Sequence, residues 1–227
     1  MAKKEQEFAK QDERLEEVNE TLTGAGKWIE DNANTISWVV AAIAIVVMAV
    51  IAINQYVIKP KALEASNENA KAAVYFMAGD YEKALKGDDA ECIGFEAIAD
   101  EYSFYQQGEL AALYAGICYY EQGEYEEAAK YLKEFSANDL NIDPAACQLL
   151  GDAYVELQEY GKAAKAFEKA AESGNELIAP MSLKKLGILY LHEGQNAKAL
   201  KAFKAIKADY PASAEAQDVD KYIAVAE

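Results

Sequence analysis

The sequence predicts an all-α protein, in which a single apolar helix near the N-terminus is followed by a superhelix of paired helices. Three observations lead to this fold class. Residues 32–58 contain no charged side chain, a Gly-x-x-Tyr motif recurs three times at a nearly constant interval, and short turns rich in Gly and polar residues separate the helices of each pair.

The N-terminal tail, residues 1–31, has the pattern of a charged amphipathic helix. Phe8, Leu15, Val18 and Leu22 fall on one face of a helix over residues 3–22. The stripe is thin and the tail is acidic, so a helix of a partner protein is a better match for it than a membrane surface. Disorder is the alternative, and the helix is favoured over it because the tail is rich in Glu, Gln and Lys.

Residues 32–58 are predicted to form a transmembrane anchor that contacts the lipid bilayer. A helix of about 20 apolar residues crosses the hydrocarbon core, and Trp28, Trp38 and Tyr56 suit the aromatic belts at its two surfaces. The run is longer than the apolar core of a signal peptide and lacks an Ala-x-Ala cleavage site. A buried helix of a soluble protein would be unusually long.

The lysines near this segment bear on its orientation. Lys59, Lys61 and Lys71 follow it, whereas Lys27 is the nearest before it. Basic residues favour the cytoplasmic side, but this rule loses force for long translocated domains. The lysines alone therefore leave the side of the membrane open.

Residues 59–107 are predicted to contain a linker helix and an irregular first repeat. A helical pattern with Tyr75, Gly79, Tyr81 and Ala84 at repeat positions is interrupted by residues 86–92 and then resumes. Such irregularity is common in a terminal repeat.

Three motifs then recur in register through residues 108–211. Gly116, Gly151 and Gly187 each begin a Gly-x-x-Tyr, 35 and 36 residues apart. At fixed distances after the glycines come three alanines and three large residues: Ala128, Ala163 and Ala199, then Leu132, Phe167 and Phe203. Glycine within a helix costs up to about 1 kcal/mol relative to alanine. We therefore expect close approach of a partner helix, with the alanine opposite the glycine and the tyrosines in the core.

This period and these residues resemble the tetratricopeptide repeat. The resemblance implies antiparallel helix pairs stacked into a superhelix whose first helices line a concave groove. Residues 212–227 are predicted to cap the stack, because Ser213 can begin a last helix with a thin apolar stripe.

Composition and motifs predict a protein without catalytic activity, cofactor or metal. The formal net charge of −17 disfavours nucleic acid as a partner. His192 is the one histidine, and Cys92, Cys118 and Cys147 lack metal-ligand spacing. Cys118 and Cys147 fall on apolar helix faces and are interpreted as small buried residues. Phosphate-binding and nucleophile motifs are absent from the sequence.

The groove positions of the repeat family, transferred to this sequence, predict the peptide-binding residues. They are Phe76, Met77, Leu113, Ile117, Tyr120, Gln148, Asp152, Val155, Lys184, Ile188 and Leu191. Lys184 against Asp152 does not make the basic ring that holds a C-terminal carboxylate. The predicted ligand is an apolar or mixed peptide segment, and packing against neighbouring helices is the alternative role for each side chain.

The whole arrangement resembles the YfgM-like bacterial proteins. It consists of a short tail, one transmembrane helix and acidic repeats, and it includes the interrupted helix at residues 87–102. The resemblance implies a single-pass inner-membrane protein with periplasmic repeats, an ancillary subunit of the SecYEG translocon. Its implied partners are translocon subunits, the chaperone PpiD and emerging polypeptides. A cytoplasm-facing membrane receptor or assembly factor, and a structural subunit of an envelope complex, remain the alternatives.

Overall fold

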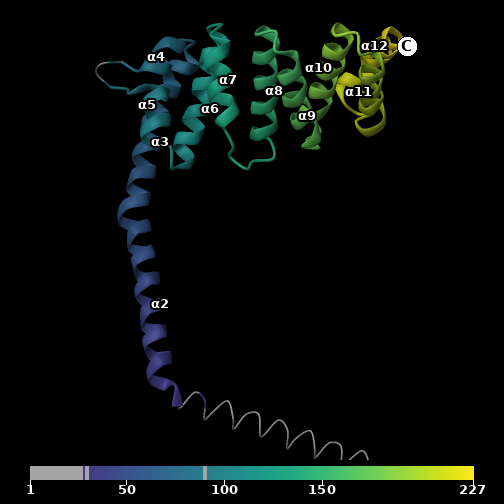
Figure 1. Cartoon of the computed structure of the whole chain (residues 1–227). Coiled ribbons are helices and arrows are strands. Elements are labelled where there is room, and N and C mark those ends of the chain that lie inside the picture. The colour runs from purple at the N-terminus through teal and green to yellow at the C-terminus, as the bar shows by residue number, and fades with distance from the viewer. Residues whose placement is uncertain (1–27, 29–30, 89–90) are drawn as a thin grey trace, which may run out of the picture. The chain divides into compact units, whose positions relative to one another are not determined.

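The computed structural model describes Trp28, residues 31–88 and residues 91–227, and its regular elements are helices (Figure 1). The predicted tail helix lies outside the described residues. The helices are α2 (Ala33–Ile53), the π-helix η1 (Asn54–Ile58), α3 (Lys59–Met77), α4 (Tyr81–Lys86), α5 (Gly94–Glu101), α6 (Gln106–Glu121), α7 (Tyr125–Glu134), α8 (Ile142–Glu156), α9 (Tyr160–Glu172), α10 (Ile178–His192), α11 (Asn196–Asp209) and α12 (Ala214–Ala226).

The chain divides into two units, Met1–Lys59 and Pro60–Glu227. In the first unit, α2 has no buried residue, and the helix is long and apolar enough to cross a membrane. Proline has no N–H to donate, and the π-helix η1 ends at Ile58, two residues before Pro60. There the N–H of Lys59 bonds the carbonyl of Asn54, one residue further back than in an α-helix.

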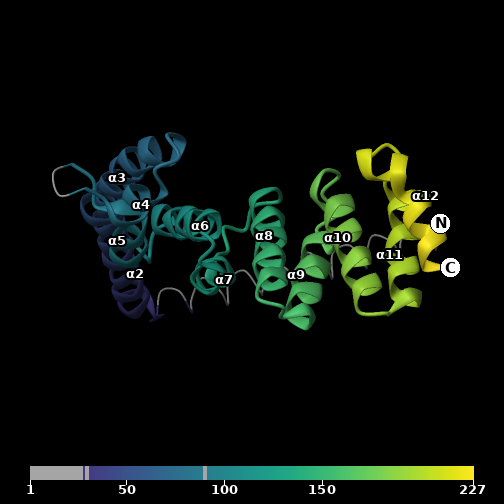
Figure 2. The same cartoon turned by 90° about the horizontal axis from the view of Figure 1, so that it is seen from above.

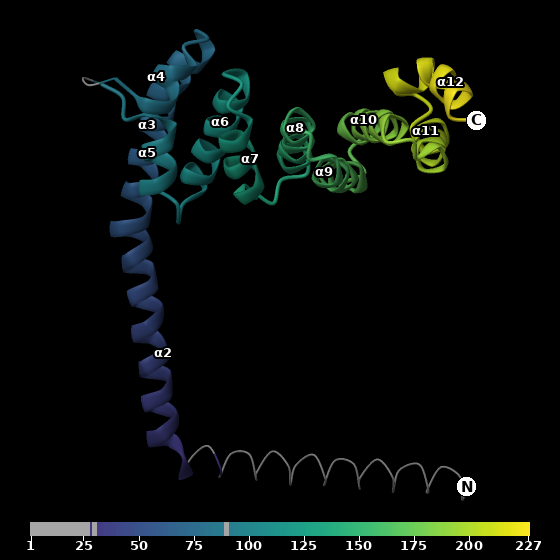
Figure 3. The same cartoon turned by 45° about the horizontal axis from the view of Figure 1, so that its top comes forward.

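The second unit is a stack of helix pairs. The pairs α6 and α7, α8 and α9, and α10 and α11 follow one another along it. Seen from above, and again in a tilted view, α8 and α10 form one row and α9 and α11 the other (Figures 2 and 3). Tight turns join the helices of a pair, and Gly123 and Gly194 adopt positive φ angles of 79° and 71° there.

The repeat glycines make notches that receive large side chains. A Cβ atom on Gly151 would lie 2.5 Å from Cε1 of Phe167, and one on Gly187 would lie 2.4 Å from Cε1 of Phe203. Gly116 meets the side chain of Leu132 in the same way. The expectation that the alanines oppose the glycines was therefore wrong. The large residue one turn after each alanine fills the notch, because the helices approach closely enough for an aromatic ring to reach the bare backbone.

The first repeat is irregular, as the sequence predicts. Helix α4 ends at Lys86, a loop with an isolated bridge between Asp88 and Cys92 follows, and α5 begins at Gly94. The two ends of this loop lie close together, since a Cβ on Gly87 would lie 2.1 Å from the carbonyl oxygen of Cys92.

The predicted capping helix is confirmed as α12. Ser213 is its N-cap and accepts a hydrogen bond from the N–H of Ala216 at 3.2 Å. Val219 and Ala226 are buried, and Tyr222 stacks on Phe203 of α11 with ring centroids 5.3 Å apart.

The core of the stack divides into two large clusters and one small one. The first runs from Ala65 to Ala153 and the second from Ala163 to Ala226. Beside the first cluster, Leu113, Leu132, Phe135 and Ala146 form a small cluster that includes residues of α6, α7 and α8, and Leu150 packs against both.

Candidate binding groove

The first helices of the repeats bring several predicted groove residues onto one row of the stack (Figure 3). Ile117 and Tyr120 of α6, Val155 of α8 and Leu191 of α10 are half-buried, and Ile188 of α10 is 43% exposed. These side chains pack partly on their neighbours and keep part of their surface available.

A cavity of about 320 Å³ opens between α8, the start of α9 and α10. Asp152, Val155 and Ile188, all predicted groove residues, line it. The remaining lining residues are Tyr160, Phe167, Lys185, Leu189 and His192. The wall is mostly apolar with one charged pair, which suits the side chain of a bound peptide.

The charged pair in this cavity joins Asp152 to Lys185, with Nζ and Oδ2 2.5 Å apart. Burial raises the pKa of the Asp152 carboxyl, the bond from Lys185 opposes the rise, and the nearby Glu156 adds to it. Lys184, the one basic residue among the predicted groove positions, does not pair with Asp152. Lys184 bonds Asp218 of α12 at 2.9 Å instead, because successive residues of a helix point in directions about 100° apart.

Carboxylates gather around Tyr120 at the neighbouring part of the groove. Burial raises the pKa of the Tyr120 hydroxyl to about 12, and the carboxylates of Asp152, Glu156 and Glu121 contribute to the rise. The ring of Tyr120 lies edge-on to Tyr125, with centroids 5.4 Å apart. This stretch of the groove therefore combines aromatic surface with excess negative charge.

Other predicted groove residues have contacts within the stack. Leu113 is only 9% exposed and belongs to the small cluster of Leu132, Phe135 and Ala146, against which Ile117 also packs. The side-chain oxygen of Gln148 accepts a hydrogen bond from the hydroxyl of Ser182, which is fully buried, at 3.0 Å. For Leu113 in particular, packing leaves little surface for a ligand.

The two predicted residues on α3 have different surroundings. Phe76 packs edge-on against Tyr114 and Phe95, with ring centroids 5.1 Å and 6.4 Å apart, as part of the first core cluster. Met77 is 78% exposed at the end of α3. Neither residue lines the cavity described above.

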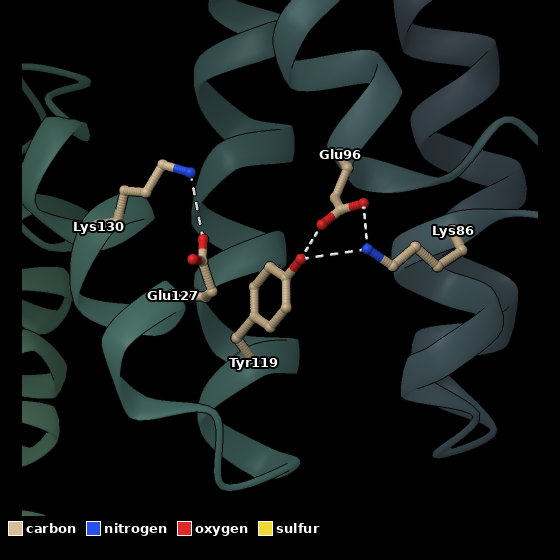
Figure 4. Close-up of polar contacts among 5 residues, drawn as sticks. All are labelled: Lys86, Glu96, Tyr119, Glu127 and Lys130. Atoms are coloured by element: carbon tan, nitrogen blue, oxygen red, sulfur yellow. Dashed lines mark hydrogen bonds and ion pairs between the residues drawn. The ribbon is translucent and has the colours of Figure 1, made fainter.

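Polar contacts between neighbouring repeats hold the groove helices in place. The hydroxyl of Tyr119 on α6 donates to Glu96 of α5, whose other carboxylate oxygen pairs with Lys86 of α4 at 2.7 Å (Figure 4). In the third repeat, the hydroxyl of Tyr190 donates to Glu168 of α9 at 2.7 Å. Two of the three motif tyrosines, Tyr119 and Tyr190, thus add hydrogen bonds to their packing role.

The cysteines are buried or half-buried, and burial raises the pKa of each thiol, that of Cys118 to about 12. A raised pKa keeps the thiol protonated and unreactive at neutral pH. Among the described residues, no group of three or more His, Cys, Asp or Glu side chains is placed to hold a metal ion.

Sequence reasoning missed Lys185, Tyr160 and His192 as cavity residues. The ring of His192 lies edge-on to Tyr160 with centroids 5.0 Å apart. A weak signal for Lys185 exists in the sequence, since it lies 33 residues after Asp152, close to one repeat period.

Comparisons with known proteins agree with this architecture. Family models of the tetratricopeptide repeat match residues 110–139 and 149–214. No curated protein matches the sequence. Among solved structures, MamA AMB-1 is 22% identical with a TM-score of 0.54, covering 72% of this chain and 81% of its own. MamA MSR-1 is also 22% identical, with a TM-score of 0.51 over 72% of this chain and 85% of its own.

These likenesses establish the fold of the second unit. The chain contains tetratricopeptide repeats, and repeats of this kind bind other proteins.

Proposed function

We propose that this protein is a membrane-anchored, non-catalytic scaffold whose groove binds apolar or mixed peptide segments. The observation that carries the proposal is the cavity between α8 and α10. Its apolar wall, with Val155 and Ile188 facing a single ion pair, can accept one large apolar side chain of a partner.

The charges near the cavity favour a segment that also carries basic residues. Lys185 neutralises Asp152, whereas Glu121 and Glu156 are exposed and without a salt bridge among the described residues. A Lys or Arg beside the apolar anchor would complement these carboxylates. An acidic C-terminal carboxylate would be repelled.

The apolar helix supports the anchoring part of the proposal. Helix α2 has no buried side chain, and an apolar helix of this length needs either a bilayer or a protein partner to cover it. We place the repeats in the periplasm of a bacterial inner membrane. There they would associate with the SecYEG translocon and the PpiD chaperone and receive emerging polypeptides.

The second candidate is a cytoplasm-facing receptor or an assembly subunit of an envelope complex. The lysines at positions 59, 61 and 71 favour it, because basic residues beside a span are enriched on the cytoplasmic side.

Partner capture tests the groove. We expect Ile188→Asp in the full-length protein to weaken binding of a peptide that combines an apolar anchor with lysines by at least about 10-fold, since it places a charge in the apolar wall. Val225→Asp makes the same change at an exposed residue of α12 and serves as the matched control. Equal binding by the two folded variants would contradict the groove assignment.

Topology separates the two candidates. A reporter fused after Glu227, active only in the periplasm, should be active in cells under the first candidate. Purification in mild detergent should then recover translocon subunits together with the protein. Activity of a cytoplasm-specific reporter at the same position would exclude the translocon assignment.

A further inference from the structure

Helix α3 carries an exposed, mostly apolar stripe from Leu63 to Met77. Leu63 is 64% exposed, Val74 is 60% exposed, and Asn67 and Ala70 between them are also exposed. Met77 completes the stripe at the end of the helix. The intervals alternate between four and three residues, which keeps these side chains on one face.

The opposite face of α3 is the one that packs on the repeats. Ala65 and Ala72 are fully buried, and the amide of Asn69 donates to the carbonyl of Gln107 at 2.8 Å. Lys61 pairs with Glu101 of α5 at 3.8 Å on the same side. The stack therefore uses the face with small residues and leaves the face with Leu63 and Val74 outside.

The exposed stripe has the chemistry of a two-stranded parallel coiled coil. In heptad terms, Pro60, Asn67 and Val74 occupy a positions, and Leu63, Ala70 and Met77 occupy d positions. A β-branched residue at a with leucine at d favours two strands, and one asparagine at an a position selects the dimer and its register.

Charges beside the stripe complement those of a second copy. Lys59 occupies the g position that precedes Glu64 at e by five residues, which is the spacing of an interhelical ion pair in a parallel coiled coil. Within one chain, these two side chains contact Gln55 and Lys61 on the surface, where they are free to exchange partners.

We propose that α3 mediates a parallel homodimer through this stripe. The inference rests on the proposed anchor in one respect: two copies inserted in the same bilayer with the same topology present their α3 helices in parallel and at high local concentration. This matters because α3 has 19 residues, and so short a coiled coil is weak in dilute solution.

Cysteine cross-linking in the full-length protein, reconstituted in liposomes, tests the arrangement. Ala70→Cys should give a dimer on mild oxidation, because d residues of two parallel helices face each other. Lys61→Cys is the matched control, since position 61 lies at b on the packed side. The wild-type chain measures the background from the native cysteines. Equal cross-linking at positions 61 and 70 would overturn the proposal.

A second pair of variants tests the stripe without cysteine chemistry. Leu63→Glu with Val74→Glu should raise the dissociation constant of the dimer in liposomes by about 100-fold, because four unpaired charges would be buried in the dimer. Val225→Glu adds a charge at another exposed apolar site and should leave the constant unchanged. Both proteins should keep their helical circular dichroism. An unchanged dimer in the double variant would overturn the proposal.

The charge pair gives an independent readout of register. Lys59→Glu and Glu64→Lys should each weaken the dimer several-fold through like-charge contacts, and the double exchange should restore it. If the double exchange weakened the dimer by as much as the two single changes added together, the parallel register would be contradicted.

Extraction with alkaline carbonate distinguishes this inference from the anchor. A chain that is extracted but still cross-links at position 70 contradicts the anchor and supports the dimer. A chain that stays in the membrane but does not cross-link at position 70 contradicts the dimer and leaves the anchored scaffold intact.

Discussion

Each repeat glycine leaves room for a large side chain because it lacks a Cβ atom. Gly187 is in the middle of α10, where glycine weakens the helix, yet it allows the ring of Phe203 to lie against the backbone. The aromatic ring is fully buried in return. The intrinsic cost of glycine in the helix is thus offset by the burial of a large side chain one helix away.

We expect Gly187→Ala to reduce the free energy of unfolding by about 1–3 kcal/mol, since the new methyl group would overpack the notch. Gly161→Ala is the matched control, because Gly161 lies in α9 and a Cβ atom added there would have nothing within 4 Å. It should increase stability by up to about 1 kcal/mol. Urea unfolding of both variants measures the difference, and equal stabilisation by the two alanines would contradict the notch.

Asp152 gives stability a pH dependence with a defined sign. Its folded pKa is raised from 3.8, first through burial, so its contribution to stability is fully present below pH 3.8. This contribution is lost as the pH rises through the folded pKa. Lys185 limits this loss of stability, because its ammonium group stabilises the ionised form of the Asp152 side chain.

Lys185→Met should therefore increase the stability lost between pH 4 and pH 7 by about 1 kcal/mol relative to wild type. Lys165→Met on the exposed side of α9 is the control, and its pH profile should match wild type. Urea unfolding across this pH range checks the prediction. If the free energy of unfolding of Lys185→Met depended on pH in the same way as that of Lys165→Met, the ion pair with Lys185 would not control the ionisation of Asp152.

At the scale of elements, the motif tyrosines connect neighbouring repeats unequally. Tyr119 and Tyr190 donate to glutamates of the preceding helices α5 and α9 (Figure 4). Tyr154 stands at the same motif position in α8, but its hydroxyl has no hydrogen bond within the part of the chain that the structure describes. The repeat at α8 is therefore joined to its predecessor mainly by apolar contacts.

Tyr190→Phe should cost about 1 kcal/mol of stability, the usual contribution of one hydrogen bond, because it removes only the hydroxyl. Tyr154→Phe makes the same change where no such bond exists, and we expect it to be neutral within about 0.5 kcal/mol. Thermal or urea unfolding distinguishes the two. Equal effects would mean that the hydrogen bond to Glu168 adds no net stability.

At the scale of the molecule, the stack has two large cores, and a small cluster packs beside the first of them. Helices in a repeat stack contact only near neighbours, so stability is a sum of local terms and parts of the stack can open separately. The second core, from Ala163 to Ala226, includes the capping helix. We expect it to open as a unit.

Phe203→Leu should test this by weakening the second core by about 1 kcal/mol. Hydrogen exchange should then accelerate about 5-fold in α10, α11 and α12 and remain near wild type in α5 and α6. The conservative change keeps the protein folded. A uniform acceleration over the whole stack would show that the two cores unfold together.

The sequence by itself determined the elements and their order. The 35- and 36-residue spacing of Gly116, Gly151 and Gly187, the interrupted first repeat and the cap at Ser213 are local patterns, each set by backbone demands or by side chains a few residues apart. Only the tertiary structure decided which side chains meet. It paired Asp152 with Lys185 and filled the glycine notches with large residues, because these contacts depend on how one helix is rotated against the next.

Helix α3 shows most clearly that the tertiary structure decides which face of a helix is buried. Hydrophobicity alone would bury Leu63 and Val74 and expose Asn69, and the structure does the reverse. The small residues Ala65 and Ala72 allow the close approach that the stack requires, and Asn69 can bond a backbone carbonyl there. Packing distance and hydrogen bonding, which are properties of two surfaces together, fix the face that remains outside.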